Sequence, residues 1–240
     1  MQGFIISPTV SVTKVKCLKV LWGALLVTGF SVAAAAFETP HPRLTWQSAI
    51  LPLTVPVERL DQHHRRAMTD ECSATVIATH PARLLSAWHC FDGYNDLTKP
   101  PMVMTSEGPM ALRLIASGGS MLADWALLAP ADRYVDAALS TYPSLVVAPL
   151  RSMPNAAVVM AGFSHVSGDQ QRQLRADMHC QASRADRHWV RSDCIAYKGA
   201  SGGPVLQRMG SEWRVVGVIS AKEDSGTRLF TLVPQRLLNR

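Results

Sequence analysis

The chain has 240 residues, of which 48% are hydrophobic, 18% charged and 7% aromatic, and its formal charge is +6. This composition is that of a folded globular protein and excludes a disordered or collagen-like chain. No segment repeats along the sequence, so solenoids and low-complexity arrays are excluded as well. The length suits one large domain or two small ones.

The N-terminus has the pattern of a secretory signal. Three lysines precede an uncharged, largely apolar stretch, Val20–Ala36, and alanines two residues apart stand before Phe37, as signal peptidase requires. A retained membrane anchor is the alternative, but the stretch falls short of the roughly 18 apolar residues that suggest a spanning helix. We therefore predict a signal peptide over residues 1–36 and a mature domain over residues 37–240, located in a periplasm or secreted.

Removal of this segment changes the charge of the chain. It takes away three lysines and no acidic residue, so the formal charge falls from +6 to +3. The remaining arginines are scattered, and only Arg65 and Arg66 are adjacent. Because no basic run is left to follow a phosphate backbone, we expect no nucleic-acid partner. We also expect no membrane association after signal removal.

Four cysteines remain in the mature chain once Cys17 is removed with the signal. An even number in an exported chain indicates disulfides, and four cysteines allow three pairings. The pairs Cys72–Cys90 and Cys180–Cys194 are each close in sequence and far from one another, which favours local pairing. A zinc site is the alternative, but neither CxxC nor HExxH occurs. We predict two disulfides, no metal and no cofactor.

Short apolar runs separated by Gly, Pro, Asp or Ser follow along the mature chain, and they indicate strands of a barrel or sandwich. These runs are Ser73–Thr79, Ala111–Ala116, Trp125–Ala129, Ser144–Ala148, Ala156–Gly162, Trp213–Ser220 and Leu229–Val233. Helical periodicity is scarce, with candidates at Leu60–Ala67, a turn at Ala87–Phe91 and a C-terminal piece, Pro234–Arg240. The segment Tyr142–Asn155 holds three prolines and is expected to link two halves.

Two titratable side chains stand at the ends of strand-like runs. His89 ends the run in LLSAWHCF, directly before Cys90, and histidine is the side chain best suited to take and return a proton near neutral pH. Asp124 precedes the apolar run of LADWALLA, where a buried carboxylate needs a donor such as a histidine N–H. Taken alone, each is better explained by a structural role.

The most specific signal is KGASGGPVL, which contains Ser201. Three glycines around this serine permit a sharply bent backbone that exposes the hydroxyl. The same bend would direct the N–H groups of Gly199 and Ser201 at one point, as an oxyanion hole requires. A glycine-rich β-turn without catalytic function is the alternative.

Together the three segments resemble the trypsin- or chymotrypsin-like serine peptidases. LSAWHC resembles L-T-A-A-H-C, DWALL resembles D-I-A-L-L, and GASGGPV resembles G-D-S-G-G-P, in the family order His, Asp, Ser. VVMAGF resembles the strand before the family's Gly-Trp-Gly, and VVGVIS resembles the strand that ends in its substrate-binding serine. The resemblance covers residues 45–240 and is to compact bacterial members.

This resemblance implies an all-β fold of two six-stranded antiparallel β-barrels, over about residues 45–141 and 156–233, with a short C-terminal helix. His89 and Asp124 would lie on the first barrel and Ser201 on the second, with the active cleft between them. The family's histidine-loop disulfide also matches the pair Cys72–Cys90.

The activity implied is that of an exported serine endopeptidase, acting as a monomer on protein or peptide substrates. Ser201 would attack the peptide carbonyl, His89 would take its proton, Asp124 would orient the imidazole, and the amides of Gly199 and Ser201 would bind the oxyanion. A catalytically silent binding protein of the cell envelope is the alternative, although no triad member or glycine is missing. GASGGP is also not the G-x-S-x-G elbow of α/β-hydrolase esterases.

The departures from the family pattern concern activation and specificity. Digestive members carry an Asp before the nucleophile, which binds a new N-terminal amine, and here that residue is Ala200. We therefore expect a loop organised without such an ion pair, so that trimming residues 37–60 gives no large gain in activity.

In the substrate pocket we expect Ile195, Ser220 and Lys222. Lys222 would either attract an acidic P1 side chain or point to solvent, and Ile195 argues against a preference for Arg or Lys.

Overall fold

The computed structural model describes residues 45–61, 64–95, 99–152, 154–165, 171–184, 189–223 and 227–238. All of them belong to one compact unit, Pro42–Arg240. The predicted signal peptide, residues 1–36, lies outside the described residues. Among the helices within them, none has the length and apolar character needed to cross a membrane.

Two closed antiparallel barrels of six strands each form the fold, as predicted. The first has the strand order β1-β2-β3-β6-β5-β4 and the second β10-β11-β12-β9-β8-β7. The strands of the first barrel are β1 (Ile50–Asp61), β2 (His64–Thr79), β3 (Ala82–Ser86), β4 (Met102–Thr105), β5 (Gly108–Ser117) and β6 (Ala126–Pro130). Those of the second are β7 (Ala156–His165), β8 (Arg172–Arg184), β9 (Trp189–Ser192), β10 (Pro204–Met209), β11 (Glu212–Lys222) and β12 (Arg228–Leu232).

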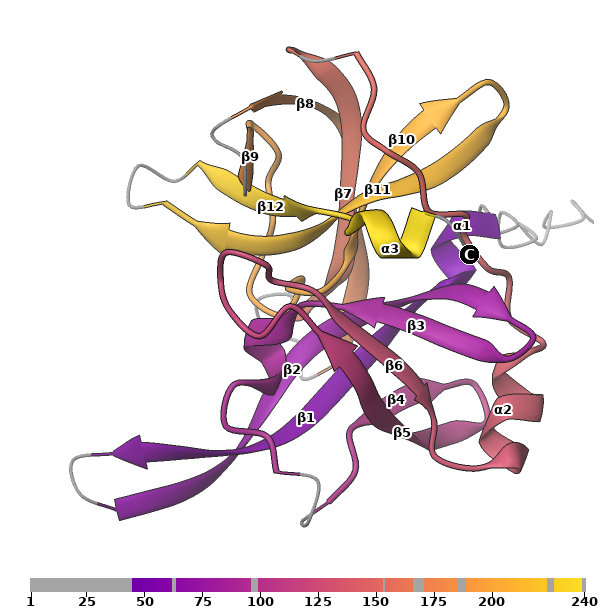
Figure 1. Cartoon of the computed structure of the whole chain (residues 1–240), viewed down its shortest axis with the longest axis vertical. Coiled ribbons are helices and arrows are strands. Elements are labelled where there is room, and N and C mark those ends of the chain that lie inside the picture. Colours follow the sequence, from indigo (N-terminus) through magenta and orange to yellow (C-terminus); the bar gives the residue numbers. More distant parts are fainter. Residues whose placement is uncertain are drawn as a thin grey trace, which may run out of the picture. The chain divides into compact units, whose positions relative to one another are not determined.

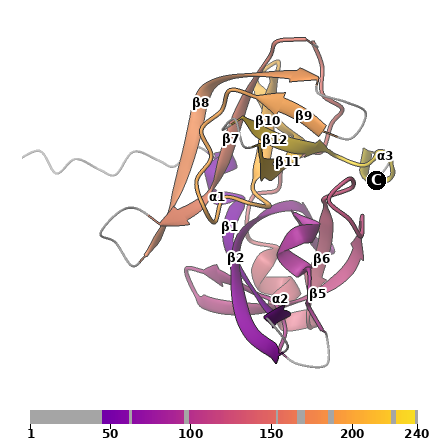
Figure 2. The same cartoon turned by 90° about the vertical axis from the view of Figure 1, so that its left-hand side faces the viewer.

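The barrels lie one above the other, the first in purple and magenta and the second in orange and yellow (Figure 1 and Figure 2). Short helices connect or follow the strands. They are α1 (Thr45–Ser48), the 3₁₀ turn η1 (Trp88–Phe91), α2 (Arg133–Leu139) and α3 (Gln235–Leu238). The predicted C-terminal helix is therefore present as α3, and it lies beside both barrels in Figure 1.

Strand β1 shows how the sequence forms the barrel wall. Leu53, Val55 and Val57 are buried and alternate with partly exposed residues, which is the period of two expected of a strand with one face on a core. Pro52 and Pro56 occupy the outward positions of this alternation. They interrupt the apolar pattern in the sequence, which is why the strand was not predicted.

The predicted helix at Leu60–Ala67 is wrong, because this segment belongs to the hairpin of β1 and β2. Leu60 pairs with Arg65 and Glu58 with Ala67 in antiparallel register. The ladder that begins at the barrel continues outward into this hairpin, so that strand pairing overrides the weak helical periodicity. Leu60 is 80% exposed, as expected for a hairpin that extends away from the core.

The predicted strand at Ser144–Ala148 is also wrong in extent, since the segment forms only one isolated bridge, Val147 to Val215. Its backbone nevertheless contacts both barrels: the Leu145 N–H donates to the Val76 carbonyl, and the Ala148 N–H donates to the Val215 carbonyl. The segment thus runs extended from the first barrel to the second.

Helix α2 was not predicted, although its N-cap is visible in the sequence. The Asp132 carboxylate accepts hydrogen bonds from the N–H groups of Tyr134 and Val135, which satisfies two amides that a helix start leaves free. The helix has only seven residues, too few for its periodicity to stand out.

The cysteines form both predicted disulfides, Cys72–Cys90 and Cys180–Cys194. The first joins β2 to η1 in the first barrel. The second joins β8 to the segment after β9 in the second barrel.

Arg172 on β8 holds the two barrels together through hydrogen bonds to backbone carbonyls of the first barrel. Its guanidinium donates to the carbonyl oxygens of Cys72 at 2.7 Å and Leu53 at 3.1 Å. Burial lowers the pKa of Arg172, and the nearby Glu71 carboxylate opposes this shift. The guanidinium therefore gives up part of its hydration and regains hydrogen bonds across the barrel interface.

We expect the substitution Arg172→Met to lower the free energy of unfolding by about 2 to 3 kcal/mol, because it leaves two carbonyls without a charged donor. Urea denaturation followed by tryptophan fluorescence measures the change. Arg59→Met is the control, since Arg59 forms a surface ion pair with Asp70 and such pairs contribute about 0 to 1 kcal/mol. Equal losses in the two variants would contradict the role of Arg172.

Candidate active site

His89 lies in η1, directly after strand β3, and the Cys72–Cys90 disulfide fixes this turn on β2. Its backbone N–H donates to Asp124 Oδ1 at 2.8 Å, and its ring Nδ1 lies 2.7 Å from Asp124 Oδ2. Because a carboxylate accepts hydrogen bonds, the imidazole carries its proton on Nδ1 and keeps Nε2 as an acceptor. The side chain of His89 is 25% exposed, whereas that of Asp124 is fully buried.

Asp124 precedes strand β6, and its side chain is completely buried. A buried carboxylate is costly unless hydrogen bonds satisfy it. Three donors do so here: the backbone and the ring of His89, and the hydroxyl of Ser220. Ser220 lies on β11, so the acid of the first barrel takes one of its donors from the second.

Ser201 lies in a loop before strand β10, here called the Ser201 loop (residues 197–203), and it is partly exposed. Its carbonyl oxygen accepts a hydrogen bond of 2.7 Å from the N–H of Ser73 on β2. Ser73 follows Cys72, whose disulfide partner Cys90 adjoins His89. The structure therefore brings the Ser201 loop of the second barrel against the part of the first barrel that carries His89.

Gly202 shows how closely the two barrels meet at this loop. A Cβ atom at this position would collide with Ser86 Oγ and the carbonyl oxygen of Ser73, and would lie 2.9 Å from the Ala87 nitrogen. The backbone φ of +80° at Gly202 is also in the left-handed region. Glycine is thus required here by packing as well as by conformation.

The hydroxyl of Ser201 makes no hydrogen bond within the described residues. It is thus near the imidazole-bearing turn but not joined to His89 in this structure. Hydrogen bonds between nucleophile and base are often long in enzymes without substrate and shorten when the reactant binds.

Hydrogen bonding differs among the N–H groups of the Ser201 loop. The Ala200 N–H donates to the Tyr197 carbonyl at 3.0 Å, whereas the N–H groups of Gly199 and Ser201 have no acceptor among the described residues. Gly199 has a φ of +93°, which glycine adopts without strain. These are the two amides that the sequence predicted for an oxyanion hole.

The three residues predicted for the substrate pocket lie in different environments. Ile195 is 58% exposed, and its N–H donates to Asp177 Oδ2 at 2.8 Å, which places it on the surface. The hydroxyl of Ser220 is buried against Asp124. Lys222 pairs with Arg228 in the β11–β12 ladder, and its side chain lies outside what the structure describes.

The Sγ atoms of the four described cysteines are not available as metal ligands. Cys72 and Cys90 lie near His89, and a similar group combines Cys180 and Cys194 with Asp193. Both sulfur pairs are joined in disulfides, whereas a metal is bound by the thiolate.

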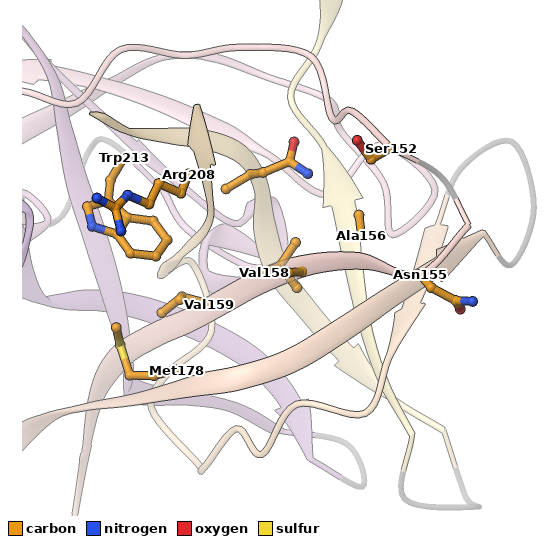
Figure 3. A pocket seen from close by; sticks show the side chains of 10 residues that line it. Ser152, Asn155, Ala156, Val158, Val159, Met178, Arg208 and Trp213 are labelled. Atoms are coloured by element: carbon orange, nitrogen blue, oxygen red, sulfur yellow. The ribbon is translucent and has the colours of Figure 1, made fainter. Parts of the chain in front are cut away.

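A cavity of about 440 Å³ lies elsewhere, among strands β7, β8, β10 and β11 of the second barrel. Figure 3 shows Arg208 and Trp213 at one end and Ser152 and Asn155 at the other. None of His89, Asp124 and Ser201 lines it, so it is separate from the candidate active site.

Comparison with known proteins identifies the family. The sequence profile of the trypsin-like peptidase domain matches residues 72–218, which is more than half of the chain. The chain belongs to the trypsin-like peptidase family. No curated protein matches it.

Solved structures of proteases share this fold. The protease Anisep from Arthrobacter nicotinovorans is 15% identical, with a TM-score of 0.60 over 79% of this chain and 91% of that one. The thermostable serine protease AL20 from an extremophilic microorganism is 15% identical, with a TM-score of 0.57 over 78% and 91%. The active form of the Rv3671c protease from M. tuberculosis is 19% identical, with a TM-score of 0.55 over 78% and 77%. The family and the observed barrels agree in giving this chain a trypsin-like peptidase domain.

Sequence analysis missed two residues that shape the site of this trypsin-like protease. Ser73 contacts the Ser201 loop through its backbone and its side chain. Gly162 lies so close to Ala200 that a Cβ would be 2.7 Å from the Ala200 Cα. No motif in the sequence indicates these contacts. Gly162 does lie in VVMAGF, which resembles the strand before the family's Gly-Trp-Gly, but that resemblance does not predict a contact with Ala200.

We expect the substitution Gly202→Ala to destabilise the fold by about 3 to 5 kcal/mol, through overpacking and left-handed strain together. The matched control is Gly210→Ala, whose φ is +66° but whose Cβ would meet nothing within 4 Å. Strain alone then costs about 1 to 2 kcal/mol. Thermal and urea denaturation measure both values. Equal losses would show that conformation, not contact with the first barrel, requires glycine at position 202.

Proposed function

We propose that this protein is an exported serine endopeptidase that cleaves peptide bonds in protein or peptide substrates, acting as a monomer. Ser201 is the nucleophile, His89 the general base and Asp124 the residue that orients it. The amides of Gly199 and Ser201 bind the oxyanion.

One observation carries this proposal. His89 is held by a fully buried carboxylate in the first barrel, and the Ser201 loop, with two unpaired amides, packs against the same part of that barrel. Because Nδ1 is bonded to Asp124, a neutral imidazole has Nε2 left to accept a proton, and the Gly199 and Ser201 amides have no acceptor among the described residues. The arrangement therefore supports acyl transfer rather than a packing role.

Acylation follows from these roles. The Ser201 Oγ attacks the peptide carbonyl carbon while its proton passes to Nε2 of His89, and the carbonyl π electrons move to the oxygen. The buried Asp124 carboxylate stabilises the imidazolium that results, and the two amides stabilise the oxyanion. The tetrahedral intermediate collapses, the C–N bond breaks, and the imidazolium gives its proton to the leaving amine.

Deacylation repeats the sequence with water. The oxygen of a water molecule attacks the ester carbon while the His89 imidazole takes a proton from that water. When the C–O bond of the ester breaks, the imidazolium gives the proton to Ser201 Oγ. The products are a carboxylic acid and the free enzyme. The chain's own residues thus supply the base, the acid and the anion site at both stages.

Export is supported by two features. Disulfides form and persist in oxidising compartments, and the structure contains two of them. The N-terminal pattern of residues 1–36 fits a signal peptide. Removal of that peptide would leave the domain at residues 37–240.

We expect Ser201→Ala to abolish labelling by a fluorophosphonate probe and hydrolysis of casein, because no other group replaces the nucleophile. Asp124→Asn should lower the turnover rate by about 10⁴-fold, since the amide favours the wrong imidazole tautomer. Labelling is followed by gel fluorescence and casein hydrolysis by release of dye-labelled peptides. Continued labelling of the Ser201→Ala protein, or no labelling of the wild type, would refute the proposed function; a catalytically silent binding protein predicts the second result.

We also expect activity that does not depend on a newly made N-terminus, because Ala200 offers no acid to bind it. Strand β1 begins at Ile50, so that trimming as far as residue 60 would remove a barrel strand. The test therefore compares chains that begin at Phe37 and at Thr45 for their fluorophosphonate labelling rates. Equal rates are expected, whereas a large gain on trimming would indicate an inhibitory segment.

A further inference from the structure

The Ser201 loop needs a support that its own sequence does not provide. In the digestive relatives that the sequence resembles, an acid before the nucleophile holds this loop through an ion pair. Here Ala200 is buried among apolar residues of the second barrel and has no charge. Another group must therefore fix the peptide planes of the loop.

Ser73 of strand β2 makes three hydrogen bonds at this point. Its N–H donates to the Ser201 carbonyl at 2.7 Å, and its hydroxyl donates to the Gly199 carbonyl at 3.0 Å. The same hydroxyl accepts a hydrogen bond from the Phe163 N–H at 2.8 Å. Ser73 is completely buried, so water does not compete for these bonds.

These bonds fix the peptide group between Gly199 and Ala200 at both ends. Its carbonyl accepts from the Ser73 hydroxyl, and its N–H donates to the Tyr197 carbonyl. Rotation of this peptide would break both hydrogen bonds inside the protein. The amides on either side, those of Gly199 and Ser201, have no acceptor among the described residues, so their directions depend on this fixed peptide.

The hydroxyl also links the loop to a second support. Phe163 belongs to β7, and a Cβ on Gly199 would lie 2.8 Å from the Phe163 carbonyl oxygen. The backbone of β7 thus packs directly on the loop. The Ser73 hydroxyl accepts a hydrogen bond from the Phe163 N–H of this strand and donates one to the Gly199 carbonyl of the loop. One side chain of the first barrel thereby connects two segments of the second.

We propose that Ser73 is the positioning residue of the oxyanion site, and that its hydroxyl, acting across the barrel interface, takes the place of the ion pair that Ala200 precludes. This inference rests on the proposed function of Gly199 and Ser201. Ser73 does not touch the reacting atoms. It acts on the rate of acylation by holding the two amides in the directions that a developing oxyanion needs.

The variant Ser73→Ala tests this inference by removing the hydroxyl while keeping the β2 backbone. With p-nitrophenyl acetate as the probe, burst kinetics separate the acylation rate constant from the substrate dissociation constant. We expect the acylation rate constant to fall about 10- to 100-fold, as for a displacement of catalytic groups by about 1 Å, with little change in the dissociation constant. The fluorophosphonate labelling rate should fall by a similar factor.

Ser164→Ala is the matched control. Ser164 is as buried as Ser73 and lies beside the same loop, since its Cα would be 3.5 Å from a Cβ on Gly199. Its hydroxyl has no hydrogen-bond partner within the described residues. This variant should keep the wild-type acylation rate, because it removes a buried serine hydroxyl without removing support from the loop.

Ser73→Thr is the second variant, since it keeps a hydroxyl at the same position and should recover much of the acylation rate lost in Ser73→Ala. All rates are taken per folded molecule, with the folded fraction measured by circular dichroism.

Equal rates for Ser73→Ala and Ser164→Ala, or a loss confined to the dissociation constant, would overturn the proposal. Failure of both Ser73 variants to fold would also overturn it, because the hydroxyl would then serve the stability of the domain. A wild type that neither labels nor hydrolyses the ester would instead refute the proposed function.

Discussion

The carboxylate of Asp124 is buried where both barrels contribute its hydrogen-bond donors. An isolated carboxylate in such a place would lose several kcal/mol of hydration free energy, and only the packed molecule restores this loss. His89 supplies two donors from the first barrel and Ser220 supplies one from the second. The same contacts that satisfy the acid also fix the tautomer and the direction of the imidazole. The orientation of the His89 imidazole is therefore coupled to the packing of the two barrels.

The Ser201 loop reaches its place for a second reason, which is steric. Gly162, Gly202 and Gly203 each stand where a Cβ would lie within 3 Å of backbone or side-chain atoms of another segment. The glycines of the loop motif therefore permit close contact between backbones in addition to a sharp bend. Within GASGGP, Gly202 allows contact with the first barrel and Gly203 allows contact with strand β7 of the second, and packing this close tolerates few substitutions.

The apolar runs alone predicted a barrel or a sandwich, whereas the family resemblance of the motifs around His89, Asp124 and Ser201 implied two barrels. Several strands could be recognised as apolar runs. Strand β1 could not, because the two prolines on its outer face interrupt its apolar pattern. The segment Leu60–Ala67 was wrongly predicted as a helix because long-range pairing between β1 and β2, and not local periodicity, determines its structure.

The sequence did not show the contacts of residues that belong to no recognisable catalytic motif. Ser220 was assigned to a substrate pocket because VVGVIS resembles the family strand that ends in the substrate-binding serine, and in the structure its hydroxyl donates to Asp124. Ile195 was assigned from its distance to Ser201 along the chain, yet it is largely exposed. Such an assignment assumes that the loop before Ser201 has the same length in all members of the family. Such partners depend on the three-dimensional approach of segments far apart in sequence.

Support of the Ser201 loop by neutral hydrogen bonds has different physical consequences from support by an ion pair. An ion pair with a new N-terminus forms only after cleavage and depends on the charge of an amine. The bonds of Ser73 need no charged group and no cleavage, because both partners belong to the folded barrels. Ser73 also adjoins Cys72, whose disulfide to Cys90 leads to His89. A short covalent path therefore links the support of the Gly199 and Ser201 amides to His89, so that one part of the first barrel positions both parts of the proposed catalytic site.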